Sequence, residues 1–168
     1  LTLYHNIYIH TSTHIIGHSS ASYKAAQTES VVQTTDFTFL STDMYTYQKM
    51  ESDINLFKQK YEGVTSDSIG TTPDGRNIYR IVIGNKDASK KILVIGAIHA
   101  REYITASVVM RQVKEMLDKR AEGDKSLDAV CIQYIPMLNP DGVAISQSGM
   151  AGLNKEESKK KLQEIIDS

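Results

Sequence analysis

Residues 90–102 read KKILVIGAIHARE, and this stretch decides the class of fold. Its apolar run over residues 92–97 does not alternate with polar residues, which is typical of a strand that lies in the middle of a sheet and is covered on both faces. Residues 102–119 follow with apolar side chains at helical spacing, and residues 131–138 form a second apolar run. The pattern predicts a crossover of strand, helix and strand with parallel strands, so we expect an α/β fold.

Shorter elements come before that unit. Residues 64–70 and 77–84 flank the turn sequence TTPDGR, whose proline and glycine favour a β-hairpin. Ahead of the hairpin, apolar residues recur every three or four positions as far as Gly63. This spacing predicts an amphipathic helix, and Thr42 or Asp43 is the residue that we expect to cap it.

The chain divides into three parts by pattern. Residues 1–42 are rich in Ser, Thr and His without a regular period, and we interpret them as a tail. Residues 43–153 hold the α/β unit, and residues 154–168 predict a last helix capped by Asn154. The expected domain is a mixed sheet of about four strands with a β-hairpin, a βαβ crossover and flanking helices.

Size and composition exclude several classes of protein. The 168 residues have room for one domain, and the formal net charge of -1 lacks the basic excess of a nucleic-acid-binding protein. No apolar run is long enough for a membrane span. Cys131 is the single cysteine, so the chain can form neither an internal disulfide nor a cysteine-rich zinc module.

A histidine and a glutamate lie where the central strand meets the next helix. His99 ends the strand and Glu102 opens the helix, at the edge where open α/β sheets place ligands. Side chains with this spacing can converge on one zinc ion. The alternatives are a hydrogen-bonded interior histidine and a favourable first-turn acid. His10, His14 and His18 would share one helix face and are a second place where a metal could bind.

Two motifs in this region closely resemble the zinc carboxypeptidase family. They are HAREYIT over residues 99–105 and PMLNPDG over residues 136–142, and the resemblance covers about residues 43–153. It implies the N-terminal part of a zinc-carboxypeptidase-like (phosphorylase/hydrolase-like) fold. The NPDGV form looks most like the bacterial branch of the family, which includes peptidoglycan-trimming members.

Carried over residue by residue, the resemblance implies that His99 and Glu102 are ligands of Zn²⁺ and that Arg101 contacts the substrate. It also implies that Asn139 and Asp141 support the metal site from behind. Without the resemblance, Arg101 is an ordinary solvated charge, and Asp141 is the acid of an Asx-turn before the next glycine. The implied activity of the complete protein is zinc-dependent hydrolysis of C-terminal bonds in peptides or peptidoglycan peptides.

Part of the family's site has no counterpart in this chain. After the NPDG motif, family members carry an Asn-Arg-Asn stretch, a second zinc histidine, a tyrosine and a glutamate that acts as general base, whereas residues 143–168 contain no His, Arg or Tyr. We therefore expect a truncated fragment with an incomplete site. The strand at 92–97 would then keep an open edge, through which a homodimer would form.

Two other interpretations stay open. The chain is alternatively a noncatalytic binding or assembly relic of the family, or part of a related deacylase-type zinc hydrolase. The compartment is not fixed by the sequence, and the cell exterior or envelope is favoured.

Overall fold

The computed structural model describes residues 36–41 and 44–168. The chain separates into two units, residues 1–36 and the compact unit of residues 37–168. Most of the expected tail, with His10, His14 and His18, lies outside the described residues. The helices and strands of the compact unit are α1 (Tyr47–Lys60), β1 (Thr65–Thr71), β2 (Asn77–Gly84), β3 (Lys90–Ile95), α2 (Ile104–Ala121), β4 (Val130–Ile135), α3 (Pro140–Ser148) and α4 (Glu156–Ile166).

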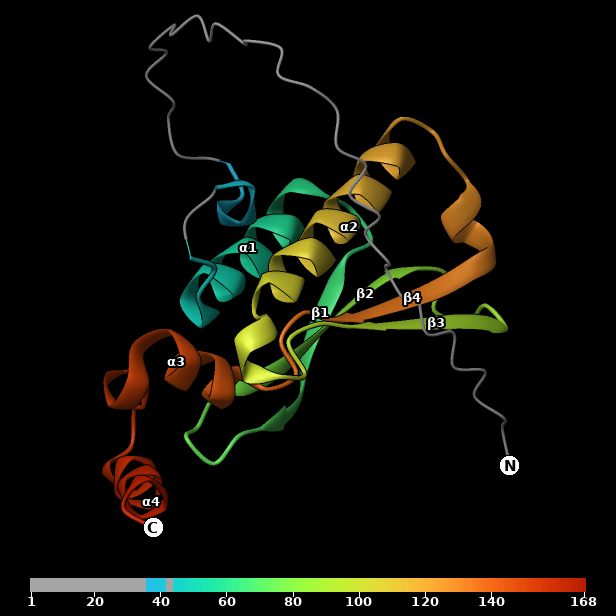
Figure 1. Cartoon of the computed structure of the whole chain (residues 1–168). Coiled ribbons are helices and arrows are strands. Elements are labelled where there is room, and N and C mark those ends of the chain that lie inside the picture. Colours follow the sequence, from blue (N-terminus) through green and yellow to red (C-terminus); the bar gives the residue numbers. More distant parts are fainter. Residues whose placement is uncertain (1–35, 42–43) are drawn as a thin grey trace, which may run out of the picture. The chain divides into compact units, whose positions relative to one another are not determined.

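The strands of the described residues form one mixed sheet in the order β1-β2-β4-β3 (Figure 1). Strands β1 and β2 are the two arms of the predicted antiparallel hairpin. Strand β4 pairs antiparallel with β2 and parallel with β3, and α2 makes the crossover from β3 to β4. The predicted α/β class, the hairpin and the crossover are therefore confirmed.

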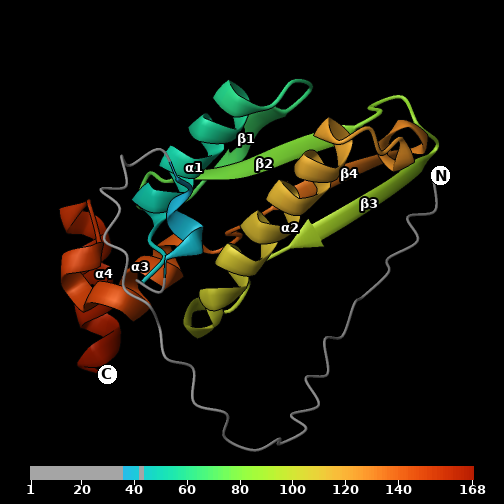
Figure 2. The same ribbon diagram turned by 90° about the horizontal axis from the view of Figure 1, so that it is seen from above.

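Helices α1 and α2 cover the same face of the sheet, α1 over the hairpin and α2 over β4 and β3 (Figure 2). Their apolar residues recur at helical spacing, so each helix turns one continuous stripe toward the strands. The core between these layers contains Met50, Ile54 and Phe57 of α1, Val109, Met110 and Val113 of α2, and Ile81, Ile83, Ile132 and Tyr134 of the sheet.

The compact unit begins at Phe37, before the boundary expected at residue 43. Phe37 and Phe39 are buried against Phe57, with ring centroids 4.4 and 5.8 Å away. The buried carboxylate of Asp53 holds this segment on α1, accepting hydrogen bonds from the amides of Thr38 at 2.7 Å and Phe39 at 3.2 Å. Aromatic residues inside a Ser/Thr-rich stretch therefore belong to the domain core.

Two expected helix caps are wrong. Helix α1 begins at Tyr47 and is capped by the side chain of Thr46, not by Thr42 or Asp43. Helix α4 has Lys155 at its N-cap, and the amide of the expected cap, Asn154, donates to the carboxylate of Asp74 instead.

Strand β3 lies at an edge of the described sheet, so the open edge expected for this strand is present, although its apolar run is typical of a strand in the middle of a sheet. Its residues alternate between the two faces. Val94 packs against the core on the helix side, whereas Leu93 and Ile95, on the opposite face, are 52% and 37% exposed. An apolar run predicts that a strand is buried on both faces, but no described element covers the face of β3 that carries Leu93 and Ile95.

None of the described helices combines the length and the apolar composition that a membrane crossing requires.

Candidate metal centre

The corner between β3 and α2 begins with two small residues. A Cβ atom on Gly96 would lie 2.6 Å from the carbonyl oxygen of Pro136 and 3.0 Å from that of Thr105, so only glycine fits. Ala97 follows with a φ of 46°, a left-handed backbone conformation that is unfavourable for residues other than glycine. Its amide donates to the Thr105 hydroxyl at 2.7 Å. The backbone is thus held in a strained turn directly before His99.

His99 and Glu102 converge at this corner. His99 is extended, and the residues after it form the short 3₁₀ turn η2 (Ala100–Glu102). The Thr105 hydroxyl donates to the Glu102 carbonyl at 2.7 Å and fixes the end of the turn. Side chains three residues apart overlie one another in such a turn. His99 Nδ1 accordingly lies 3.1 Å from Glu102 Oε2, and the two side chains are 77% and 60% exposed.

Arg101, between these residues, faces a hollow. It is exposed and lines an open hollow of about 510 Å³ together with Gly142, Ile145 and Ser146 of α3. Helix α3 packs against η2, so the hollow lies between this helix and the turn that contains Glu102. The hollow is therefore a place beside the candidate metal site that can accept part of a ligand.

Asn139 lies beside the same corner because β3 and β4 stay paired beyond their ends. The Asn139 amide donates to the Ala97 carbonyl at 3.0 Å. Its side chain then caps α3, since Oδ1 accepts from the Gly142 amide at 3.0 Å. Helix α3 was not among the expected elements, although an Asn cap followed by proline at the first helical position is a known signal for a helix start.

Asp141 points in another direction, toward the hairpin loop. Its carboxylate accepts from the Thr72 hydroxyl at 2.8 Å, the Asp74 amide at 3.0 Å and Arg76 Nη1 at 2.8 Å. The alternative interpretation of Asp141 as an Asx-turn acid is wrong, because its carboxylate accepts from these groups of the hairpin loop, while the Val143 amide two residues on donates to the Asn139 carbonyl. Asp141 therefore ties α3 to the loop between β1 and β2.

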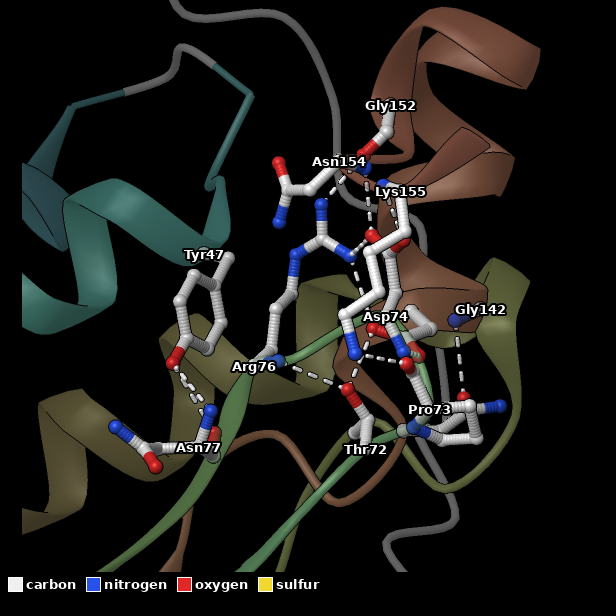
Figure 3. A network of polar contacts seen from close by, with 12 residues as sticks. Tyr47, Thr72, Pro73, Asp74, Arg76, Asn77, Gly142, Gly152, Asn154 and Lys155 are labelled. Atoms are coloured by element: carbon white, nitrogen blue, oxygen red, sulfur yellow. Dashed lines mark hydrogen bonds and ion pairs between the residues drawn. The ribbon is translucent and has the colours of Figure 1, made fainter. Parts of the chain in front are cut away.

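Arg76 is the centre of this polar network (Figure 3). Its buried guanidinium lies 2.6 Å from Asp74, donates to the Gly152 carbonyl and stands 5.8 Å from the ring of Tyr47. Its Nε atom has no hydrogen-bond partner among the described residues. Sequence reasoning missed this network, whose members are far apart in the chain.

The carboxylate of Asp74 stays ionised inside the network. Burial by itself raises the pKa of Asp74, but hydrogen bonds from the amides of Asn154 and Lys155, and from the side chains of Ser158 and Arg76, outweigh it and lower the pKa to about 2. The loop, α3 and the start of α4 are therefore joined by a charged centre at neutral pH.

The His99 and Glu102 pair fits a zinc ion. Two bonds of about 2.0 to 2.2 Å at a tetrahedral angle place their donor atoms roughly 3.4 Å apart. The observed separation of 3.1 Å is close to this value. Among residues 36–41 and 44–168, no group of three or more His, Cys, Asp or Glu side chains could hold a metal. The described residues thus present two donors of the types that zinc prefers.

A family model decides the relationship of this chain to known proteins. The model described as zinc carboxypeptidase matches residues 50–165, a range that includes both motifs and the corner. The chain belongs to the zinc carboxypeptidase family. The resemblance that the two motifs predict is confirmed.

Individual relatives agree with the family match. Carboxypeptidase B of Astacus astacus is 31% identical over 105 residues, which are 61% of this chain and 35% of the relative. An inactive metallocarboxypeptidase of Saccharomyces cerevisiae is 29% identical over 129 residues, 71% of this chain and 30% of the relative. The chain thus spans about a third of the length of these zinc carboxypeptidase relatives.

The fold agrees as well. The crystal structure of carboxypeptidase A from Helicoverpa armigera superimposes with a TM-score of 0.56 and 22% identity, over 66% of this chain and 28% of that one. The described sheet and helices are therefore part of a zinc carboxypeptidase fold.

Proposed function

We propose that this chain is part of a zinc-dependent metallocarboxypeptidase and that His99 and Glu102 are ligands of its Zn²⁺. The observation that carries this proposal is the distance of 3.1 Å between His99 Nδ1 and Glu102 Oε2 at an exposed strand-to-helix corner. Both side chains are exposed, which disfavours the alternative of a hydrogen-bonded interior histidine and leaves the pair accessible to a metal ion. The strained turn at Ala97 and the Thr105 hydroxyl hold the two donors in place.

The surroundings support a hydrolytic role in the complete protein. Bound zinc polarises a substrate carbonyl and lowers the pKa of a coordinated water. Arg101 lines the adjacent hollow, where a guanidinium can bind a carbonyl or carboxylate oxygen of a peptide or peptidoglycan peptide. Asn139 stabilises the start of the helix that forms the other wall. Asp141 anchors that helix to the hairpin loop.

A noncatalytic role is the second candidate. It is favoured by the similarity to a relative that is itself named inactive. In that case the corner persists as a binding or assembly module. A deacylase-type zinc hydrolase is a third candidate, because its motif also resembles His-x-x-Glu.

The open edge of β3 supports a homodimer. The backbone groups on its outer side face no other strand of the described sheet, and Ile92 and Leu93 are 38% and 52% exposed. Antiparallel pairing of two such edges would satisfy these groups and bury apolar surface. Light scattering of zinc-free chain should then give twice the mass of one chain, and a monomer at high concentration would contradict this pairing.

Zinc titration tests the proposed ligands. Isothermal titration of the purified chain should show weak zinc binding that His99→Ala and Glu102→Gln both abolish, because each removes one of the two donors. Glu157→Gln, which removes an exposed carboxylate of α4, is the matched control and should bind zinc as the unaltered chain does. Zinc binding that is undiminished in His99→Ala would refute the proposed site.

A further inference from the structure

The contact between the His99 and Glu102 side chains depends on the backbone that carries them. The two side chains are 77% and 60% exposed, so packing by neighbouring side chains restrains them little. Exposed side chains change rotamer within picoseconds to nanoseconds. The distance of 3.1 Å between His99 Nδ1 and Glu102 Oε2 is therefore set by how the main chain presents the two residues to each other.

One side-chain hydroxyl closes the main chain around the pair. The Thr105 hydroxyl accepts from the Ala97 amide at 2.7 Å, ahead of His99, and donates to the Glu102 carbonyl at 2.7 Å. A hydroxyl has one proton to donate and lone pairs to accept with, so a single group can make both bonds. Inside this loop the Glu102 amide donates to the His99 carbonyl at 3.1 Å. The segment from Ala97 to Glu102 is thus joined at both ends to one oxygen atom.

The first residue of this loop is held in an unfavourable conformation. Ala97 is buried and has a φ of 46°, in the left-handed region that favours glycine. A residue stays in such a conformation only where the surrounding structure determines it. Two hydrogen bonds do so here, one from the Asn139 amide to the Ala97 carbonyl at 3.0 Å and one from the Ala97 amide to the Thr105 hydroxyl. Loss of the hydroxyl would leave the Ala97 amide buried without this acceptor.

We propose that Thr105 is a positioning residue of the candidate metal centre, whose hydroxyl sets the distance between His99 Nδ1 and Glu102 Oε2 that a zinc ion requires. This inference rests on the proposed function, because it takes His99 and Glu102 as the ligands. Groups that orient metal ligands from behind commonly change metal affinity by roughly 10- to 100-fold when they are mutated. Thr105 is such a group, and it acts through the backbone on either side of the ligands.

The alternative is that the hydroxyl only stabilises the start of α2, and the same helix offers a matched example of such a role. The Ser107 hydroxyl donates to the Ile104 carbonyl at 2.8 Å, and Ser107 is buried. This bond stays within the first turn of the helix. Loss of either hydroxyl should lower the stability of the chain. Only the loss of the Thr105 hydroxyl should also weaken the binding of zinc.

Titration with zinc sulfate, followed by NMR, tests the proposal. The ring signals of His99, identified by their loss in His99→Ala, report binding at this site even when it is weak. Thr105→Val keeps the shape of the side chain without the hydroxyl and should weaken zinc binding by about 10-fold or more. Thr105→Ser and the control Ser107→Ala should bind zinc about as tightly as the unaltered chain. Urea unfolding should show that Thr105→Val and Ser107→Ala are both destabilised.

A measurement without zinc tests the cause of the change. In EDTA, nuclear Overhauser contacts between the His99 ring and the Glu102 side chain should be present in the unaltered chain and in Thr105→Ser, and lost in Thr105→Val. Circular dichroism shows whether each variant is folded. If Thr105→Val does not fold, comparison of Thr105→Ala with Thr105→Ser tests the same hydroxyl in a smaller side chain.

Three results would overturn the inference. Equal zinc affinity in Thr105→Val and the unaltered chain, or an equal loss of affinity in Ser107→Ala, would refute the positioning role and leave the proposed ligands standing. Contacts between the His99 ring and the Glu102 side chain that persist in Thr105→Val would do the same. If zinc shifts no signal of His99 in the unaltered chain, the ligands of the proposed function are wrong, and the role of Thr105 is refuted with them.

Discussion

Arg76 Nη1 lies 2.8 Å from Asp141 Oδ1, although the two residues are 65 positions apart in the chain. One belongs to the hairpin loop and the other to the first turn of α3. Because α3 also packs against η2, this ion pair connects the loop to the helix that flanks the candidate metal centre. The stability of that region should therefore depend on a bond that is remote from the ligands.

Asp141→Ala should destabilise the chain by about 3 kcal/mol, because the Thr72 hydroxyl, the Asp74 amide and Arg76 Nη1 all lose this acceptor. Urea unfolding measures the change. Asp67→Ala removes the carboxylate of another Asp–Arg pair, whose side chains are 50% and 34% exposed, and should cost less than about 1 kcal/mol. Equal losses in the two variants would contradict the structural role of Asp141.

Stability should fall in acid through Asp74. Burial acts to raise the pKa of Asp74, but its hydrogen bonds lower the pKa from 3.8 to about 2 in the folded chain. When folding lowers a pKa, the ionised group stabilises the fold fully at any pH above its pKa in the unfolded chain. For Asp74 this stabilisation is about 2 kcal/mol, and it is lost as the pH falls from about 4 to about 2. Urea midpoints measured across this range should decline less in Asp74→Asn than in the unaltered chain. A decline of the same size in both would show that other carboxylates dominate.

Asp53→Ala should destabilise the start of the compact unit. The Asp53 carboxylate accepts from the amides of Thr38 and Phe39, from the Thr38 hydroxyl at 2.7 Å and from the Tyr45 hydroxyl at 3.0 Å, so its loss leaves four donors without this acceptor. Each buried donor without an acceptor costs about 1 to 3 kcal/mol, so the free energy of unfolding should fall by more than about 3 kcal/mol. Ser52→Ala, at the exposed neighbouring position of α1, should change the urea midpoint little. If both variants unfold alike, the segment from Phe37 does not belong to the core.

The 168-residue chain by itself should release no C-terminal residue from peptides or muropeptides. It presents the two proposed zinc donors at the corner, and residues 143–168 supply neither the second zinc histidine nor the arginine of the family's Asn-Arg-Asn stretch. A water activated by metal also needs a base to take its proton. The measurement is incubation with C-terminally varied substrates in zinc, beside a complete zinc carboxypeptidase. Zinc-dependent release that Glu102→Ala abolishes would contradict the expectation.

Local patterns in the sequence determined the class of fold and the place of the candidate site. The apolar run at 92–97, the turn sequence between β1 and β2, and the periodic residues of α2 each depend on neighbours within a few positions, so backbone preferences alone reveal them. The contact between the His99 and Glu102 side chains is also determined by the local sequence. The two residues are three apart, and a tight turn after a strand leaves their side chains little choice of direction.

Tertiary structure alone decided which surfaces are buried. The apolar run of β3 is typical of a strand that is covered on both faces, but the cover of a strand depends on elements far away in the chain, and Leu93 and Ile95 are exposed on the face opposite the helices. Phe37 and Phe39 stand in a polar stretch, and only their contact with Phe57 shows that they are core residues. The same holds for Arg76, whose partners Asp141 and Gly152 come from distant segments. A hydrogen bond across such separations leaves no periodic trace in the sequence, because it is set by the packing of whole elements.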